Sequence, residues 1–173
     1  MSSVTDEQQI NTPRKLHLPG IGKVIDVACG GTVCMILNGG SELIVPQPCI
    51  VGFTTGESLL SEERDVFVWG FGILGKGPAL EFSRTPVQIP NTLFGRNEFS
   101  PDVRVTSVHA GVHIQAAINS NGELFTWGKN KGKCLGLGDA KDQYFPLKVS
   151  LVNEVSKLSL GVDHSAALCK PWA

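Results

Sequence analysis

Hydrophobic and polar residues alternate along most of this chain in short runs. The segments 112–118 (VHIQAAI) and 123–128 (ELFTWG) are typical, and Gly, Pro and Asn residues separate such runs from one another. Alternation with a period of two predicts half-buried β-strands joined by turns. No window of ten or more residues shows a helical period. The pattern therefore predicts an all-β chain.

One turn is predicted in more detail. Asn121 and Gly122 stand between the apolar residues Ile118 and Leu124. Asn-Gly favours a type I′ hairpin turn, in which both central residues have positive φ. We therefore expect a two-residue hairpin at this position.

The phrases DVFVWG (65–70) and ELFTWG (123–128) repeat each other, with tryptophans 58 positions apart. Each phrase is followed by a glycine-rich loop and then by a proline segment: ILGKG (73–77) and TPVQI (85–89) in one copy, CLGLG (134–138) and FPLKV (145–149) in the other. Stacked repeats bury one large aromatic per unit. Trp69 and Trp127 are therefore predicted to pack between units.

A second motif precedes the tryptophan in each unit. It covers residues 105–118 and recurs at 155–168 and 24–37. These registers divide the chain into the end of a preceding blade (1–22), a blade with an inserted loop at about 38–64 (23–102), a further blade (103–153) and the start of another (154–173).

The motifs resemble the regulator of chromosome condensation repeat, which runs V-x-x-V-x-x-G-x-x-H-[ST]-x-A-L, then G-x-L-[FY]-x-W-G, then G-x-L-G-x-G. Residues 65–78 (DVFVWGFGILGKGP) are similar to the mitochondrial, guanine nucleotide exchange factor-like branch of that family. The resemblance implies a β-propeller that closes with seven blades. This chain carries about three of the seven, so we expect a partial propeller without a closed ring.

The chain departs from the family pattern at the repeat histidine. His164 keeps it, whereas Ile114 and Val33 stand at the matching positions of the other two copies. In the family this is a packing position, so His164 is expected to be structural.

The insertion at about 38–64 adds roughly 23 residues relative to the internal repeat and contains Pro46 and Pro48. Proline disfavours a central strand, so a projecting loop is expected. One hypothesis makes this loop a wedge that contacts a partner; the other makes it a poorly ordered segment without a binding role.

Residues 70–75 (GFGILG) match G-x-G-x-x-G, the fingerprint of a dinucleotide-binding loop. Such a loop needs a following helix, but Pro78 and the extended segment 85–89 follow instead. Because a similar loop recurs at 128–138 without the fingerprint, we interpret residues 70–75 as a blade turn and expect no cofactor.

Histidine spacing offers one metal hypothesis. His109 and His113 are four residues apart but flank Gly111 in a strand-turn context, and no third ligand is evident. Both histidines, like His164, are therefore expected to be structural and satisfied by the backbone, and His17 is expected at the surface. Catalytic residues stay unknown, and no metal site is predicted.

Composition narrows the function classes. The net charge is −1, and Lys129, Lys131 and Lys133 form the main basic cluster, which is too small for non-specific nucleic-acid binding. Five cysteines without a C-x-x-C pair indicate neither a disulfide framework nor a common zinc site, so a reducing compartment is the simpler interpretation. The apolar runs are too short to span a bilayer.

The resemblance implies a protein-interaction propeller rather than an enzyme. It would act as an exchange factor-like regulator of a GTPase, for example a mitochondrial dynamin-like one in mitochondrial fusion. The alternative is a scaffold in mitochondrial ribosome assembly that binds ribosomal RNA or ribosomal proteins. A dinucleotide-binding enzyme is the third hypothesis. Mitochondrial localisation is expected from the family alone, since residues 1–10 do not read as a transit peptide.

Overall fold

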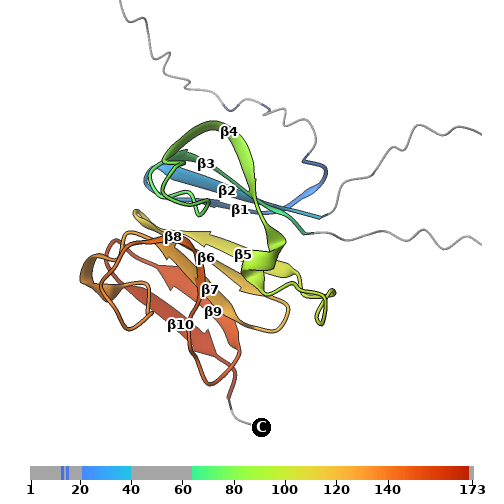
Figure 1. Cartoon of the computed structure of the whole chain (residues 1–173), viewed down its shortest axis with the longest axis vertical. Coiled ribbons are helices and arrows are strands. Elements are labelled where there is room, and N and C mark those ends of the chain that lie inside the picture. The colour runs from blue at the N-terminus through green and yellow to red at the C-terminus, as the bar shows by residue number, and fades with distance from the viewer. Residues whose placement is uncertain (1–12, 14, 16–20, 40–63, 172–173) are drawn as a thin grey trace, which may run out of the picture.

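The computed structural model describes residues 13, 15, 21–39 and 64–171, and in this part the chain forms strands joined by turns (Figure 1). The elements are β1 (Val24–Cys29), β2 (Val33–Asn38), β3 (Val66–Phe71), β4 (Phe82–Ile89), η1 (Asn91–Phe94), β5 (Val105–Ala110), β6 (Ile114–Asn119), β7 (Leu124–Gly128), η2 (Lys131–Lys133), β8 (Gln143–Lys148), β9 (Val155–Leu160) and β10 (Ser165–Cys169). Of the described helices, none is long and apolar enough to cross a bilayer.

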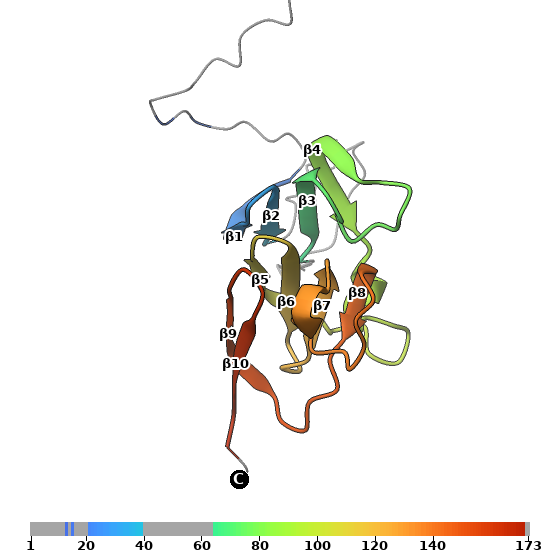
Figure 2. The ribbon, with the colours of Figure 1, turned by 90° about the vertical axis from the view of Figure 1, so that its left-hand side faces the viewer.

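The strands form three successive antiparallel sheets, which we name blade A (β1–β4), blade B (β5–β8) and blade C (β9 and β10). Within each blade, neighbours in the sequence are neighbours in the sheet. The innermost strands β1, β5 and β9 contact one another in turn, and they stack along one side of the molecule (Figure 2). The all-β prediction and the partial propeller are confirmed, and the described sheets do not close into a ring.

The unit boundaries proposed from the repeats stay a prediction. Most of the predicted insertion at about 38–64 lies outside the described residues, and so does His17. The ends of the inserted segment are nevertheless joined: Asn38 N–H donates to the Asp65 carbonyl (3.1 Å), and Asp65 N–H donates to Asn38 Oδ1 (2.7 Å). The segment thus leaves blade A and returns to it at one point.

The main core lies between blades A and B. Apolar side chains of blade A, including Met35, Leu37 and Val68, pack against Phe125 and Trp127 of blade B. Phe94, in the connection between the blades, lies edge-on to Phe125, with ring centroids 5.8 Å apart. Burial of this apolar surface stabilises the pair of blades as one unit.

Two glycines allow blade B to approach the blade A loop closely. A Cβ on Gly75 would stand 2.8 Å from Trp127 Nε1, and a Cβ on Gly77 would stand 2.8 Å from the Phe145 ring. Both glycines also have positive φ, at 78° and 97°. The glycine-rich loop is therefore shaped to receive an aromatic side chain from the next blade.

The predicted type I′ turn at Asn121 and Gly122 is wrong. Gly122 has φ 71°, but Lys133 is the one described non-glycine residue with positive φ, so Asn121 does not have the required conformation. Asn119 determines the turn instead. Its Oδ1 accepts hydrogen bonds from the N–H groups of Asn121 and Glu123, both at 3.0 Å. A three-residue loop with a left-handed glycine at its end results.

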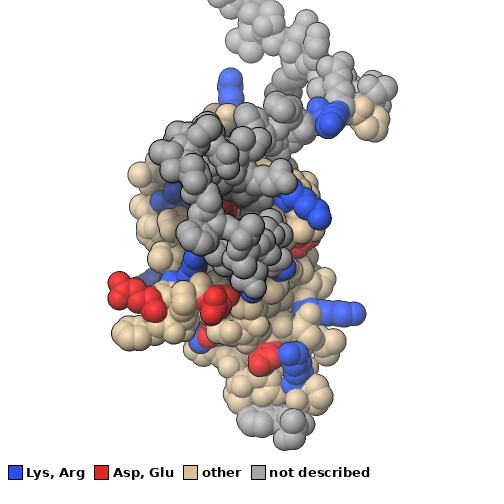
Figure 3. All heavy atoms as spheres, turned by 90° about the vertical axis from the view of Figure 1, so that its right-hand side faces the viewer, with Lys and Arg blue, Asp and Glu red and all other residues tan. Residues whose placement is uncertain are grey.

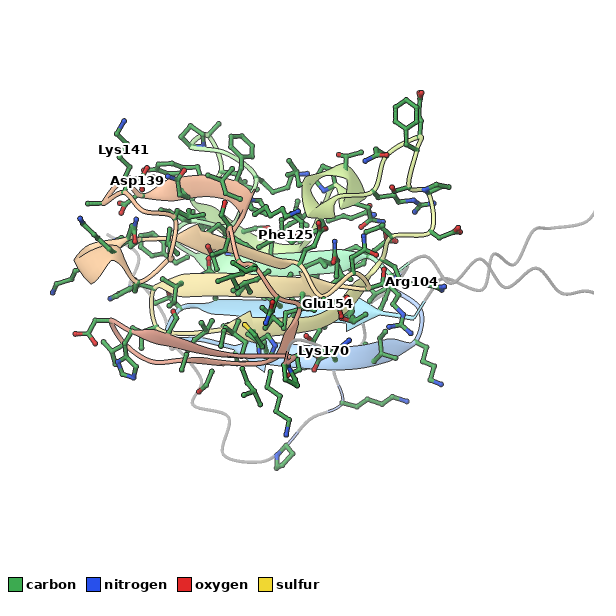
Figure 4. All side chains as sticks on the ribbon, turned by 90° about the horizontal axis from the view of Figure 1, so that it is seen from below. Arg104, Phe125, Asp139, Lys141, Glu154 and Lys170 are labelled. Atoms are coloured by element: carbon green, nitrogen blue, oxygen red, sulfur yellow. The ribbon has the colours of Figure 1, made fainter. Side chains whose placement is uncertain are left out.

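The strand directions give the propeller two faces. We call the turn face the one that carries the β1–β2 and β5–β6 turns and the glycine-rich loops, and the hairpin face the one that carries the β6–β7 turn and the connection 90–104. Figure 4 shows Asp139 and Lys141 at the turn face and Arg104 at the opposite, hairpin face.

Candidate functional site

A pocket of about 120 Å³ opens on the turn face between blades A and B. Both blades contribute to its walls, which include Val33, Phe71, Ile73, Val112, Gln115 and Lys129. The lining is mainly apolar, and Phe71 is largely exposed beside it. A pocket of this size accommodates a small apolar side chain from a partner, on the order of a valine or leucine.

Gln115 is a buried polar residue among those that line this pocket. Its side chain is 2% exposed, and its Oε1 atom accepts no hydrogen bond. A buried acceptor without a partner costs about 1–3 kcal/mol. Because Gln115 Oε1 has almost no accessible surface, it lies behind the apolar walls of the pocket and not on its open surface.

The next pair of blades shows how the same position is satisfied elsewhere. Ser165 occupies in blade C the register position of Gln115, opposite the last residue of the inner strand. Its hydroxyl donates to the Cys134 carbonyl in the glycine-rich loop of blade B, at 2.8 Å. This hydrogen bond joins the start of β10 to the glycine-rich loop of the preceding blade.

Charges on the turn face are mixed. The predicted basic cluster of Lys129, Lys131 and Lys133 lies on the loop after β7, and all three residues are exposed. The same loop carries Asp139 and Asp142, and Asn130 binds both of them, through its N–H to Asp142 Oδ1 (2.8 Å) and through its side chain to the Asp139 carbonyl (2.9 Å). The lysines are therefore partly balanced by nearby carboxylates.

The hairpin face also carries charges of both signs. In Figure 3, acidic and basic side chains are interspersed on this face rather than gathered by sign. Ion pairs join Glu123 to Lys148 and Glu154 to Lys170. A hydrogen bond from Lys148 and a weaker contribution from the Asn119 hydrogen bond lower the pKa of Glu123.

A shallow hollow of about 370 Å³ lies where the inner strands of all three blades meet. Asp26 of β1 crosses to blade B there, and its Oδ2 accepts a hydrogen bond from Val108 N–H at 3.0 Å. His109 lies beside it on β5. Burial lowers the pKa of His109, and the nearby Asp26 carboxylate opposes that shift. Burial therefore favours the neutral form of His109.

The histidines predicted to be structural do not behave alike. His109 Nε2 lies 3.2 Å from Ser107 Oγ, a side-chain partner rather than the expected backbone. His113 is exposed in the turn after β5. The packing role expected for His164 is wrong: its side chain is 77% exposed, and Nδ1 lies 3.2 Å from Asp163 Oδ1. The described residues contain no cluster of three or more metal-binding side chains.

Residues 70–75 form a blade turn in the structure. Gly70 and Gly72 have positive φ, at 121° and 115°, and the loop leads into strand β4. Between this loop and β4, a stretch that the structure describes in full, no helix begins whose N-terminal amides could hold a phosphate. The glycines serve close packing instead, as Gly75 does beneath Trp127.

Comparison with known proteins explains this architecture. The sequence model described as "Regulator of chromosome condensation (RCC1) repeat" matches residues 121–168. The human RCC1-like G exchanging factor-like protein is 45% identical over 99% of this chain and 32% of its own length, and the mouse protein of that name matches equally well. This chain carries the RCC1 repeat and is similar to an RCC1-like protein over nearly all of its length.

Solved structures of RCC1 repeat proteins agree with the fold. The crystal structure of human WBSCR16 superimposes with a TM-score of 0.80 at 45% identity, over 97% of this chain and 36% of that one. The structure of Prp20p from Saccharomyces cerevisiae, described together with its binding to Gsp1p and histones, gives 0.59 at 26% identity, over 84% of this chain and 30% of that one. The chain thus spans about a third of the length of these relatives.

Proposed function

We propose that this RCC1 repeat chain belongs to an exchange factor-like regulator of a GTPase and that its turn face contributes to partner binding. One observation carries the proposal: 45% identity, over 99% of the chain, to a human protein named as an RCC1-like G exchanging factor-like protein. The pocket between blades A and B supports it, because an apolar cavity on this face suits an apolar side chain of a protein loop.

The mechanism is differential binding rather than covalent chemistry. A regulator of this kind speeds nucleotide release when it binds the nucleotide-free GTPase more tightly than the loaded form. A tenfold difference in affinity corresponds to about 1.4 kcal/mol. Such a mechanism needs a rigid binding surface, which two packed blades provide. It does not need a catalytic side chain.

The finer parts of the proposal rest on the sequence resemblance of residues 65–78. They are a mitochondrial location, a dynamin-like GTPase as the partner and a role in mitochondrial fusion. The partner-contacting wedge at about 38–64 also belongs to the proposal.

A scaffold in mitochondrial ribosome assembly is the second candidate. The exposed lysines at 129, 131 and 133 favour it. The neighbouring carboxylates Asp139 and Asp142 reduce the local positive charge, which weakens attraction to RNA phosphates. If a Lys129→Glu, Lys131→Glu, Lys133→Glu variant binds ribosomal RNA as the natural chain does, this candidate loses its support.

The test of the first candidate is binding of the purified chain to immobilised GTPases in nucleotide-free, GDP-loaded and GTP-loaded forms. Gsp1p and a mitochondrial dynamin-like GTPase are suitable probes. We expect at least about tenfold tighter binding to one nucleotide-free GTPase than to its loaded forms. Equal affinity for all forms of both probes contradicts the proposal.

A matched pair of variants tests the face. Lys129→Glu changes the charge at the turn-face pocket, and Asp102→Lys makes a change of equal size on the exposed loop of the hairpin face. We expect the first to weaken GTPase binding at least about tenfold and the second to leave it within about twofold. The reverse result would place the binding surface on the hairpin face.

A further inference from the structure

Cys29 and Cys34 lie directly opposite each other in the β1–β2 hairpin. The next pair towards the turn is hydrogen-bonded, with Gly30 N–H donating to the Val33 carbonyl at 2.8 Å. Hydrogen-bonded and non-hydrogen-bonded pairs alternate in an antiparallel ladder, so Cys29 and Cys34 form a non-hydrogen-bonded pair. Cα atoms of such pairs are about 4.5 Å apart. That spacing falls within the range of about 4.4–6.8 Å that disulfides span.

Both thiols are on the same side of blade A and can be reached by solvent. Directly opposed residues of an antiparallel pair point to the same side of the sheet. Cys29 is exposed and lines the central hollow, and Cys34 is partly exposed. Burial, together with a hydrogen bond that the Cys34 thiol donates to Cys29, raises the pKa of Cys34. Cys29 is therefore the thiol that an oxidant in solution meets first.

The pair is particular to blade A among the described units. The corresponding opposed residues are Ala110 and Gln115 in blade B, and Leu160 and Ser165 in blade C. The other described cysteines, Cys134 and Cys169, are not paired across a strand with a second cysteine. The repeat therefore does not require cysteine at these two positions.

We propose that Cys29 and Cys34 form a reversible redox modification site, in which a small-molecule disulfide such as oxidised glutathione converts the two thiols into an intramolecular disulfide. The Cys29 thiolate attacks one sulfur of the oxidant, which releases one molecule of glutathione thiolate and leaves a mixed disulfide on Cys29. The Cys34 thiolate then attacks Cys29 Sγ and displaces the second glutathione. The protein loses two protons and two electrons, and both electrons reduce the oxidant to two glutathione molecules.

The two steps have different requirements. The first needs an accessible thiolate at Cys29, and the second needs Cys34 held within reach of Cys29 Sγ. Because the raised pKa of Cys34 reduces its thiolate fraction near neutral pH, the second step is expected to accelerate as pH rises. The hairpin supplies the proximity that this step requires.

The test is oxidation of the purified, pre-reduced 173-residue chain by oxidised glutathione, followed by alkylation of free thiols, digestion without reductant and mass spectrometry. We expect the peptide that contains residues 29 and 34 to lose the mass of two hydrogen atoms, to resist alkylation and to regain two alkyl groups after dithiothreitol. Cys169, which has no cysteine opposite it, serves as an internal control and is expected to retain glutathione instead.

Two variants separate the steps. Cys34→Ser is expected to accumulate a stable glutathione adduct on Cys29, whereas Cys29→Ser is expected to react slowly because Cys34 is less accessible. Repeating the oxidation in urea tests the role of the fold. We expect the bridge to form at least about tenfold faster in the folded chain, since the fold holds the thiols together.

Two results would overturn the proposal. One is a natural chain that keeps glutathione on Cys29 and never forms the internal bridge while Cys169 reacts normally. The other is bridge formation at equal rates in the folded chain and in urea, which would show that sequence proximity alone is responsible. Circular dichroism of each variant verifies that it is folded.

Discussion

The interface between blades A and B differs sharply from the outer side of blade A, although the same motif residues stand at both. Trp127 of blade B is fully buried against the blade A loop, whereas Trp69 of blade A, at the same motif position, stays partly exposed. A Cβ on Gly75 would meet the Trp127 ring at 2.8 Å, whereas a Cβ on the equivalent Gly136 would meet only Val149, at 3.4 Å.

The difference shows that a repeat residue acquires its energetic role from the neighbouring blade. At this motif position the tryptophan is buried where a glycine-rich loop of the preceding blade lies against it. Trp127 finds such a loop, and the described residues place none against Trp69. Identical motifs should therefore respond very differently to mutation, and that contrast can be tested from the largest effect to the smallest.

The two tryptophans give the largest contrast. Trp127→Ala should lower the free energy of unfolding by about 3–5 kcal/mol, because it leaves a cavity in the core between the blades. Trp69→Ala should cost less than about 1.5 kcal/mol, since part of that side chain already contacts water. Urea unfolding followed by far-ultraviolet circular dichroism measures both. Equal losses would mean that blade B does not depend on the blade A loop.

The equivalent glycines sharpen the comparison. Gly75 and Gly136 have similar positive φ values, 78° and 71°, so alanine introduces a similar backbone strain of about 1–2 kcal/mol at each. At Gly75 the added methyl group must also displace the Trp127 ring, which adds about 1–3 kcal/mol. Gly75→Ala should thus be the more destabilising substitution by that margin in urea unfolding. Equal losses of unfolding free energy for the two alanine substitutions would indicate that backbone strain alone is responsible.

The sequence predicted the repeat, the strands and the partial propeller because alternation and motif spacing are local signals. It could not predict which tryptophan is buried, since that depends on the blade alongside. The packing role predicted for His164 was wrong for a related reason: this residue lies in blade C, where its side chain is exposed. The pocket between blades A and B could not be predicted from the sequence either, because residues of both blades form its walls.

A repeated asparagine is a further signal in the sequence. Asn38 and Asn119 stand at the same position of their units, and each Oδ1 accepts the N–H of the acidic residue before the next strand, Asp65 or Glu123. The repetition of this asparagine would have indicated its structural role. It would also have argued against the type I′ turn, since Asn119 rather than Asn121 organises the loop.

A hydrogen bond between the blades gives the third contrast. Asp26→Ala removes the acceptor of Val108 N–H and leaves that half-buried amide without its partner. We expect a loss of about 1–2 kcal/mol in the free energy of unfolding. Asp26→Asn, which keeps a side-chain oxygen, should recover at least half of it. Failure of asparagine to recover any stability would show that the carboxylate charge, and not the acceptor, is required.

The smallest effect is at the hairpin face of blade B. The pKa of Glu123 is lowered by Lys148 and Asn119, so the folded chain keeps this carboxylate charged to lower pH than the unfolded chain does. The resulting stability is present above the ordinary glutamate pKa of about 4.5 and is lost as pH falls through the lower folded value. Glu123→Gln should remove this contribution, of less than about 1 kcal/mol. Unfolding measured at pH 7 and pH 3 checks it: the difference between the variant and the natural chain should be larger at pH 7 than at pH 3.

The central structural claim is that blades A and B form one packed unit. Hydrogen exchange measured by mass spectrometry tests this claim most directly. The account predicts slow exchange in peptides from β2, β3, β6 and β7, and much faster exchange in β10, whose residues are mostly exposed. It also predicts that Trp127→Ala accelerates exchange in β2 and β3 of the other blade, whereas Trp69→Ala does not accelerate exchange in β6 and β7. Independent exchange of the two blades, unaffected by either substitution, would contradict the account.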